Sequence, residues 1–157
     1  MLKVLKFGGT SVGTLDRIAN VAQIIKKIRD EGHDVIAIVS AMSGETNKLI
    51  EYAEYYTKTP ELKEMDMLLS SGERVTSALL SIALNSIGYK AISMTGREAG
   101  IMTTDTHTKA KIEKIDTQKM KFLSIILIMY ILVQVPLVDA MELKQQLAIS
   151  LVRKLAR

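Results

Sequence analysis

The residues with the clearest chemical potential lie at the start of the chain, where an apolar segment leads into small and hydroxylated residues. Lys6 is followed by Gly8 and Gly9, and Thr10 and Ser11 come next. An ammonium group beside unshielded backbone N–H groups suits a polyphosphate. The ammonium neutralises the negative charge, and the N–H groups donate hydrogen bonds to the phosphate oxygens. This segment therefore predicts a site for a phosphorylated ligand.

The element that must position Lys6 is a short strand. Alternation along residues 2–7 places Lys6 on the same face as Leu2 and Val4, so its charge needs an anionic partner. The following glycines allow unusual backbone dihedrals and close approach of a ligand oxygen. The structural alternative is a strand, a tight turn and a capped helix, with Lys6 reaching solvent, and for an isolated Lys-x-Gly-Gly motif that alternative is the better interpretation.

Composition describes one folded domain. The 157 residues are 48% hydrophobic and 24% charged, which is typical of a globular chain. A net charge of +4, with no basic run interleaved with aromatic residues, indicates no nucleic-acid partner and suits a small anionic ligand. The chain has no cysteine and opens without a signal peptide pattern, so we expect a cytoplasmic protein without disulfides.

Three apolar segments, at residues 2–7, 35–39 and 89–94, each run into a loop of Gly, Ser and Thr. Helical patterns lie between them, which predicts an α/β fold with parallel strands joined by crossover helices. Ligands of such sheets bind at the carboxyl ends of the strands, and all three loops lie there. We therefore expect the three loops to converge on one site.

Helix boundaries follow from capping and stop signals. Ile18, Val21, Ile25 and Ile28 predict a first helix, started by Thr14 or Ser11 and ended by Gly32. Further helices are expected at roughly residues 47–56, at 61–69, and at 74–87, the last presenting Val75, Leu79, Ile82 and Ala83 before Gly88.

The last part of the chain is more apolar than the rest. Residues 122–133 form a run of 12 apolar-rich residues before Gln134 and Pro136, short of the ~20 that a membrane-spanning helix requires, so a buried strand or core helix is expected and no membrane partner. Residues 137–157, with leucine at every fourth position from Leu143 to Leu155, predict an amphipathic helix. Such a helix packs on the core or meets a partner or a membrane surface, and packing is the better interpretation.

Common nucleotide and metal motifs are missing. Residues 8–13 have Walker spacing, but Thr14 and Leu15 stand where Lys and Ser or Thr are required, and no Gly-x-Gly-x-x-Gly occurs. His33 and His107 are far apart and lack the carboxylate arrangement of a zinc motif, so we expect ordinary surface or turn residues and no metal site.

Three segments together, residues 6–12, 39–49 and 68–73, resemble the aspartate kinase branch of the amino-acid kinase family in order and spacing, over about residues 1–120. The resemblance implies a three-layer α/β/α sandwich with a mainly parallel sheet. It also implies transfer of a phosphoryl group from MgATP to the side-chain carboxylate of L-aspartate. That reaction is the first step toward lysine, by the diaminopimelate pathway, and toward threonine and methionine.

The same resemblance assigns site residues. Lys6 would neutralise charge on the transferring phosphoryl group, and the ATP phosphates would be bound by Lys6, Phe7, Gly8, Gly9, Thr10 and Ser11. Thr46 matches the threonine that contacts the amino-acid substrate, and a helix cap before Asn47 is the structural alternative. Glu73 matches a glutamate that binds the substrate ammonium, and the alternative there is a capping box at residues 70–73. Arg97 receives no role, because an exposed loop arginine is commoner.

The chain departs from the family pattern after Met120. Family members continue with an Arg-Gly-Gly-Ser-Asp segment, a Thr-Asp-Val-Asp-Gly-Val stretch and paired regulatory ACT domains, and residues 121–157 show none of these. We expect residues 1–120 to be the N-terminal part of the kinase domain, followed by a divergent tail that arose by a reading-frame change or truncation. The missing segments predict weak turnover or none. A Gly-Gly-Ser-Asp segment absent from both other frames past codon 120 would count against a reading-frame change.

Two other functions stay open at this stage. One is a kinase of the same fold acting on acetylglutamate, glutamate, carbamate or a nucleotide monophosphate, against which Thr46 and residues 70–73 favour aspartate. The other is a non-catalytic module that binds a ligand or assembles through its apolar tail. Because family members often dimerise, a homo-oligomer is a further expectation.

Overall fold

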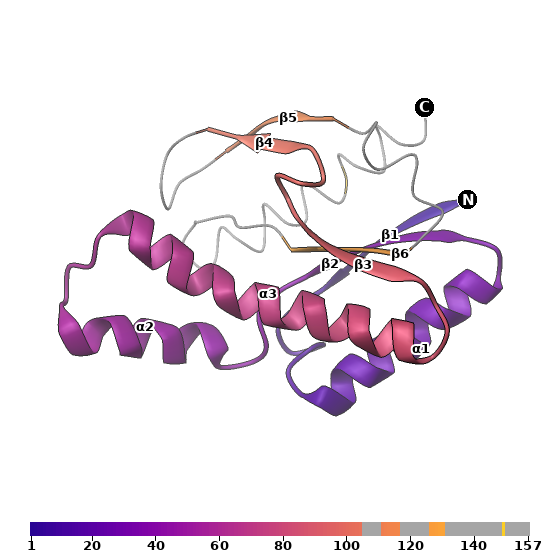
Figure 1. The fold of residues 1–157 in the computed structure, drawn as a ribbon, viewed down its shortest axis with the longest axis horizontal. Helices are drawn as coiled ribbons and strands as arrows, with labels where there is room; N and C mark the ends of the chain where they lie inside the picture. The colour runs from indigo at the N-terminus through magenta and orange to yellow at the C-terminus, as the bar shows by residue number, and fades with distance from the viewer. Residues whose placement is uncertain (105–110, 117–125, 131–148, 150–157) are drawn as a thin grey trace.

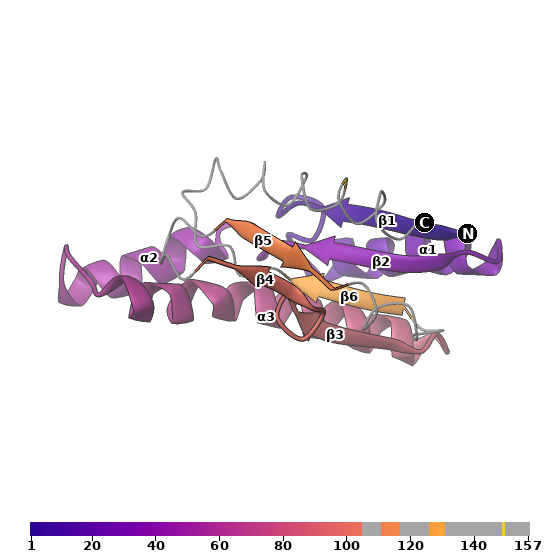
Figure 2. The same cartoon turned by 90° about the horizontal axis from the view of Figure 1, so that it is seen from above.

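The computed structural model describes residues 1–104, 111–116, 126–130 and 149. Its main sheet has four strands in the order β1 (Leu2–Phe7), β2 (Asp34–Val39), β6 (Ile126–Tyr130) and β3 (Ala91–Thr95). Every neighbouring pair is parallel, and Figure 2 shows the four strands side by side. The predicted α/β fold with a parallel sheet is confirmed.

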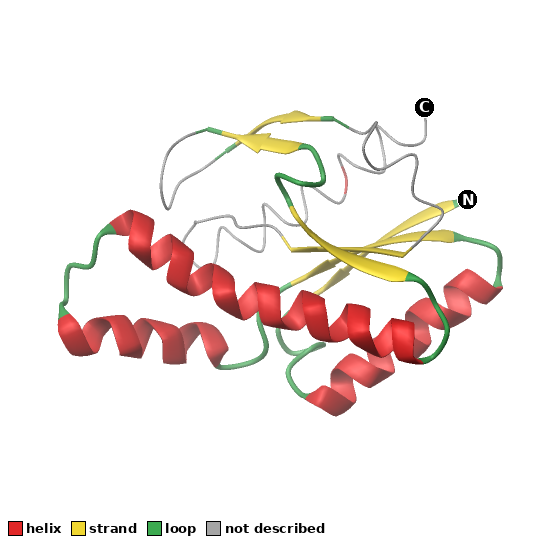
Figure 3. Cartoon of the chain, viewed as in Figure 1, coloured by secondary structure: helices red, strands yellow, loops and turns green. Residues whose placement is uncertain are grey.

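Besides the main sheet, the named elements of the described residues are three helices and a small hairpin. Figure 3 colours them by type. The helices are α1 (Leu15–Asp30), α2 (Glu45–Tyr56) and α3 (Leu62–Ser86). Strands β4 (Ile101–Thr103) and β5 (Ile112–Ile115) pair antiparallel. The helices lie on one side of the main sheet and the hairpin on the other (Figure 1). Within the described ranges, therefore, the layer opposite the helices is this hairpin.

Strand alternation divides the core into two halves. Leu5 and Phe7 of β1 pack with Val35, Ala37 and Val39 of β2 against α1 and α3. The intervening positions face the hairpin and pack with it, and they include Leu2, Val4, Ile36, Ile38, Ile92 and Met94. Because Lys6 has the parity of Leu2 and Val4, it belongs to the hairpin face of β1, as the sequence predicts.

The apolar run at residues 122–133 contributes β6, which lies between β2 and β3. Of the two structures expected there, the strand is the one formed. Ile126 is 1% exposed, as expected of a central parallel strand covered on both faces. No helix in the described ranges is both long and apolar enough to cross a bilayer. The amphipathic helix expected at residues 137–157 falls, apart from Ile149, outside the described residues.

The boundaries of α1 are as predicted. Thr14 is its N-cap, with Oγ1 accepting a hydrogen bond from the Arg17 N–H at 3.3 Å. Gly32, at φ +82°, reverses the chain after the C-cap, and the His33 N–H donates to the Ile28 carbonyl. His33 is thus a turn residue, as expected, while His107 lies outside the described residues.

Helices α2 and α3 differ from the prediction. The two helices expected at residues 61–69 and 74–87 are one helix, α3, whose buried stripe continues through the expected break. Of the apolar face predicted for this helix, Leu79 and Ala83 do pack against the core. Val75 and Ile82 are instead 52% and 62% exposed, and the fully buried positions are Leu80 and Leu84. Helix α2 begins at Glu45, two residues before the predicted start. Strand β3 begins at Ala91 and ends at Thr95, slightly later than predicted.

Candidate functional site

Lys6 is the second-last residue of strand β1, toward the carboxyl edge of the sheet, and its side chain reaches the turn that follows. It is half-buried, and its Nζ lies 3.6 Å from the position that a Cβ on Gly8 would occupy. The ammonium group therefore lies against the backbone of the glycine turn, where the sequence predicts the phosphate site. A side chain at residue 8 would share that space.

The turn after β1 is closed by its own backbone. The N–H groups of Ser11 and Val12 donate to the Gly8 carbonyl oxygen at 2.9 and 3.3 Å, and the Arg17 guanidinium donates to the Thr10 carbonyl at 2.9 Å. The Ser11 amide is thus engaged within the turn. For a ligand at this turn, Ser11 offers its hydroxyl rather than its amide.

Thr10 and Ser11 are exposed, and neither caps α1, because Thr14 fills that position. The structure therefore removes the helix-cap explanation for these two hydroxyls and leaves them at the surface of the turn. Their predicted role toward phosphate oxygens stays a prediction.

The glycines of the turn after β1 allow neighbouring segments to approach closely, and they do not adopt left-handed backbone dihedrals. Among described residues, the left-handed glycines are Gly32, Gly44, Gly88 and Gly100. At Gly9, by contrast, a Cβ would lie 3.1 Å from the carbonyl oxygen of Ala41. The predicted conformational freedom is therefore not used at Gly8 or Gly9, and the missing side chain at Gly9 admits a neighbouring loop.

Thr46 lies in the first turn of α2 and is half-buried. The N-cap of this helix is Gly44, at φ +83°, without a capping side chain. The structural alternative for Thr46, a cap before Asn47, is therefore wrong. Its hydroxyl sits at the end of α2 that faces the carboxyl edge of β2.

Glu73 lies in the interior of α3 and is half-buried. The capping-box alternative for residues 70–73 is wrong, because no helix begins there. The Ser70 and Ser71 hydroxyls donate instead to the carbonyl oxygens of Met67 and Leu68, both at 2.6 Å. Glu73 therefore lies within a continuous helix and not at a helix start.

The segments carrying Lys6, Thr46 and Glu73 meet at the loop between β2 and α2, residues 40–44. A Cβ on Gly13 would lie 3.0 Å from Ser43 Cβ, and one on Gly72 would lie 3.1 Å from Ala41 Cβ. Together with the contact of Gly9 with Ala41, these close approaches join the turn after β1, the loop after β2 and the middle of α3. The structure therefore brings together the three segments that sequence reasoning singled out.

The loop after β3 is held by a reciprocal pair that the sequence analysis did not single out. The Thr95 N–H donates to the Glu98 carboxylate at 2.7 Å, and the Glu98 N–H donates to Thr95 Oγ1 at 3.1 Å. Hydrogen bonding of the Glu98 carboxylate by the backbone of Thr95, and then by its side chain, lowers the pKa of Glu98 below its ordinary value, with a smaller contribution from the positive charge of Arg74. Arg74 follows Glu73 on α3, so this loop lies near the same helix. Arg97 in this loop is exposed.

A threonine followed three residues later by glutamate is the sequence signal that could have identified the reciprocal pair. In the described part of the chain, no three acidic or histidine side chains gather as a metal site would require.

Comparison with known proteins agrees with this arrangement. A sequence profile of the amino acid kinase family matches residues 1–130, which span all the described strands and helices named above. The chain belongs to the amino acid kinase family. This amino acid kinase chain is 51% identical over 120 residues to the aspartate kinase Ask_LysC of Stutzerimonas stutzeri. The match covers 76% of this chain and 29% of the relative, so the chain spans less than a third of that protein's length.

Solved structures show the same likeness. The aspartate kinase of Synechocystis superposes on this amino acid kinase chain with a TM-score of 0.73 at 42% identity, covering 83% of this chain and 21% of that one. Aspartokinase III of E. coli, solved in complex with aspartate and ADP, superposes with a TM-score of 0.62 at 19% identity, over 83% of this chain and 40% of that one. The second likeness is one of fold.

Proposed function

We propose that this chain forms the N-terminal part of an aspartate kinase catalytic domain, which transfers the γ-phosphoryl group of ATP to the side-chain carboxylate of L-aspartate. The observation that carries the proposal is the meeting, at the β2–α2 loop, of the segments that bear Lys6, Thr46 and Glu73. The similarity to the Stutzerimonas enzyme supports the choice of substrate.

Phosphoryl transfer from ATP to aspartate requires positive charge near the phosphates and correct positioning of the two reactants. A carboxylate oxygen of L-aspartate attacks the γ-phosphorus, the bond from that phosphorus to the β,γ-bridging oxygen breaks, and ADP leaves. Since a free aspartate side chain, with a pKa of about 3.9, is already ionised at neutral pH, the acceptor needs no general base. Both reactants are anions, so catalysis consists largely of neutralising and orienting them.

Lys6 fits the neutralising role, because its half-buried ammonium lies against the glycine turn. The phosphate contacts would come from the turn that begins at Lys6, with the exposed hydroxyls of Thr10 and Ser11 added. Mg²⁺ would arrive bound to the phosphate oxygens of ATP and neutralise part of their charge.

The amino-acid substrate would be held from the other side of the β2–α2 loop. Thr46 would hydrogen-bond L-aspartate through its hydroxyl, and Glu73 would accept hydrogen bonds from the substrate ammonium. Both side chains are half-buried on helices, which suits residues that must orient a small molecule.

The proposal extends to the setting of the reaction. It includes the first step of lysine, threonine and methionine biosynthesis, a cytoplasmic location, small-molecule substrates and assembly as a homo-oligomer. It also includes a boundary near residue 120 between the N-terminal part of the kinase domain and a divergent tail.

The test is ATP-dependent formation of aspartyl hydroxamate by the 157-residue chain, beside calorimetric titrations with MgADP and with L-aspartate. Lys6→Ala should abolish any hydroxamate signal and weaken MgADP binding. Lys3→Ala is the matched control, since it removes the same charge from the opposite face of β1 and should leave MgADP binding unchanged.

Equal hydroxamate signals from the unsubstituted and Lys6→Ala chains would remove Lys6 from the mechanism. Preference for glutamate, acetylglutamate, carbamate or a nucleotide monophosphate, assayed in parallel, would overturn the choice of aspartate. Binding of MgADP without binding of L-aspartate and without any turnover would favour a ligand-binding module.

A further inference from the structure

Gly72 is an unusual residue for its place in the fold. It lies in the interior of the 25-residue helix α3, where glycine weakens a helix relative to alanine, and it is buried. Its backbone is not left-handed, because the left-handed glycines among described residues are Gly32, Gly44, Gly88 and Gly100. Backbone conformation therefore gives no reason for glycine at this position.

The space beside Gly72 gives that reason. A Cβ at residue 72 would lie 3.1 Å from Ala41 Cβ, 3.5 Å from Leu49 Cδ1 and 3.9 Å from Glu45 Cβ. The first of these contacts is tighter than two carbon atoms normally adopt, so alanine at residue 72 would push the β2–α2 loop and α3 apart. Glycine lets the helix approach the loop directly.

Ala41 receives a second close approach, from a different segment and at a different atom. Its carbonyl oxygen would lie 3.1 Å from a Cβ on Gly9, in the turn that follows Lys6. Ala41 is 6% exposed and thus held between two segments, each of which presents a glycine to it. The separation between the turn after β1 and helix α3 depends on both missing side chains.

We propose that Gly72 is a positioning residue for the amino-acid substrate. Its missing side chain sets the approach of α3 to the β2–α2 loop, and thereby sets the place of Glu73 relative to Thr46 and to the Lys6 turn. This inference rests on the proposed function for the identity of the ligand, but the contact through Ala41 does not depend on it.

The experiment pairs Gly72→Ala with a compensating change. Gly72→Ala should weaken L-aspartate binding, measured by calorimetry in the presence of MgADP, by about tenfold or more, since small misplacements at such sites have large effects. Ala41→Gly removes the carbon that the new methyl meets, so the double variant should recover binding to within about threefold of the unsubstituted chain. Ser71→Ala, an exposed neighbour on the same helix, should bind as the unsubstituted chain does.

Gly72→Ala that binds L-aspartate normally would overturn the inference, and so would a loss that Ala41→Gly fails to restore. If Gly72→Ala unfolds the chain, refolding by the added Ala41→Gly supports the contact and continued unfolding overturns it.

Failure of the proposed function is a separate outcome. If the unsubstituted chain binds neither ligand, the amide NMR spectrum decides the inference about Gly72. Gly72→Ala should then shift the Gly9 resonance through Ala41, and Ser71→Ala should not. An unmoved Gly9 resonance overturns the inference.

Discussion

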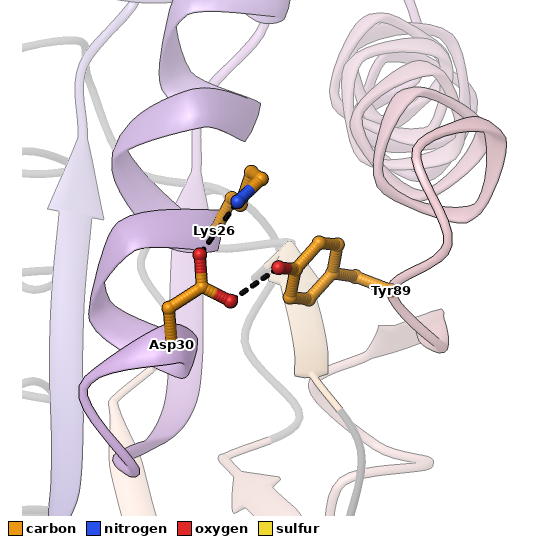
Figure 4. A network of polar contacts seen from close by, with 3 residues as sticks. All are labelled: Lys26, Asp30 and Tyr89. Carbon is orange, nitrogen blue, oxygen red and sulfur yellow. Dashed lines mark hydrogen bonds and ion pairs between the residues drawn. The ribbon is translucent and has the colours of Figure 1, made fainter.

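The two edges of the parallel sheet are held together by different means. At the edge where β2 and β3 begin, charged and polar side chains join the turns. Lys26 pairs with Asp30 at 2.5 Å, and the Tyr89 hydroxyl donates to the other oxygen of Asp30, as Figure 4 shows. At the opposite edge, where β1 and β2 end, the turn after β1 and helix α3 pack closely on the β2–α2 loop at Gly9, Gly13 and Gly72.

This difference indicates at which edge of the sheet the positions of the segments must be accurately maintained. Asp30 and Lys26 are exposed, so water and salt weaken their attraction and other partners can replace it. A close contact at a glycine does not tolerate substitution in this way, because an added methyl group would overlap with atoms of the neighbouring segment. The edge that carries Lys6 and Thr46 is the one built by steric contact, which suits a site that must hold its ligands in a fixed geometry.

The largest expected effect follows from adding a methyl group at the contact edge. Gly13→Ala would place a Cβ 3.0 Å from both the Gly9 carbonyl oxygen and Ser43 Cβ. We expect a loss of about 1–3 kcal/mol in the free energy of unfolding, together with loss of MgADP binding, because the turn after β1 must move. Urea denaturation and calorimetry measure the two quantities.

The matched control for Gly13→Ala lies at the other edge. Gly32 has φ +82° and nothing within 4 Å of its Cβ position, so Gly32→Ala adds backbone strain without a collision. We expect a cost of about 1 kcal/mol and unchanged MgADP binding. Equal losses of binding in the two variants would show that the edges do not differ as described.

A smaller effect is expected from Tyr89→Phe. The substitution removes the hydroxyl that donates to Asp30 and keeps the ring, whose centroid lies 5.3 Å from Lys26 Nζ. We expect a slight fall in the thermal unfolding midpoint and no change in ligand binding, since the Asp30 carboxylate keeps Lys26 as a partner. A fall as large as that of Gly13→Ala would contradict the contrast between the edges.

The smallest expected effect is the dependence of this polar cluster on pH. The hydrogen bond from Lys26, and then that from Tyr89, lower the pKa of Asp30 from its ordinary value of 3.8. The unfolded chain therefore binds the proton more readily, so the contribution of Asp30 to stability is present above 3.8 and is lost as the pH falls through the lower, folded value.

Acid unfolding followed by circular dichroism measures this contribution. Tyr89→Phe removes one of the two causes, so its stability should fall less between neutral and acid pH than that of the unsubstituted chain. An identical pH profile for both chains would exclude a role for the Tyr89 hydroxyl.

Local patterns in the sequence were sufficient where the stabilising contacts are themselves local. The cap at Thr14 and the stop at Gly32 each depend on hydrogen bonds within a few residues, and both were predicted correctly. The capping box at residues 70–73 is an equally local pattern and was wrong. There, burial of α3 against the β2–α2 loop and α2 outweighs the tendency of serine to start a helix.

The candidate site shows the same difference between features that local sequence patterns predict and features that depend on distant contacts. The residue types after β1 predict an anion-binding turn, because charge and hydroxyl chemistry belong to the residues themselves. The substrate contacts predicted for Thr46 and Glu73 came instead from the resemblance to aspartate kinases. The meeting of the three segments at Ala41 joins positions up to 63 residues apart, from Gly9 to Gly72, and no local pattern records it.

The sequence by itself determined the alternation of β1, the ends of α1 and the chemical character of the Lys6 turn, since each depends on neighbours along the chain. Only the tertiary structure decided that β6 lies between β2 and β3, that α3 is continuous, and that Gly72 faces Ala41. The physical reason is that these features depend on packing between distant segments, whose free energy exceeds the small preferences that a local sequence pattern expresses.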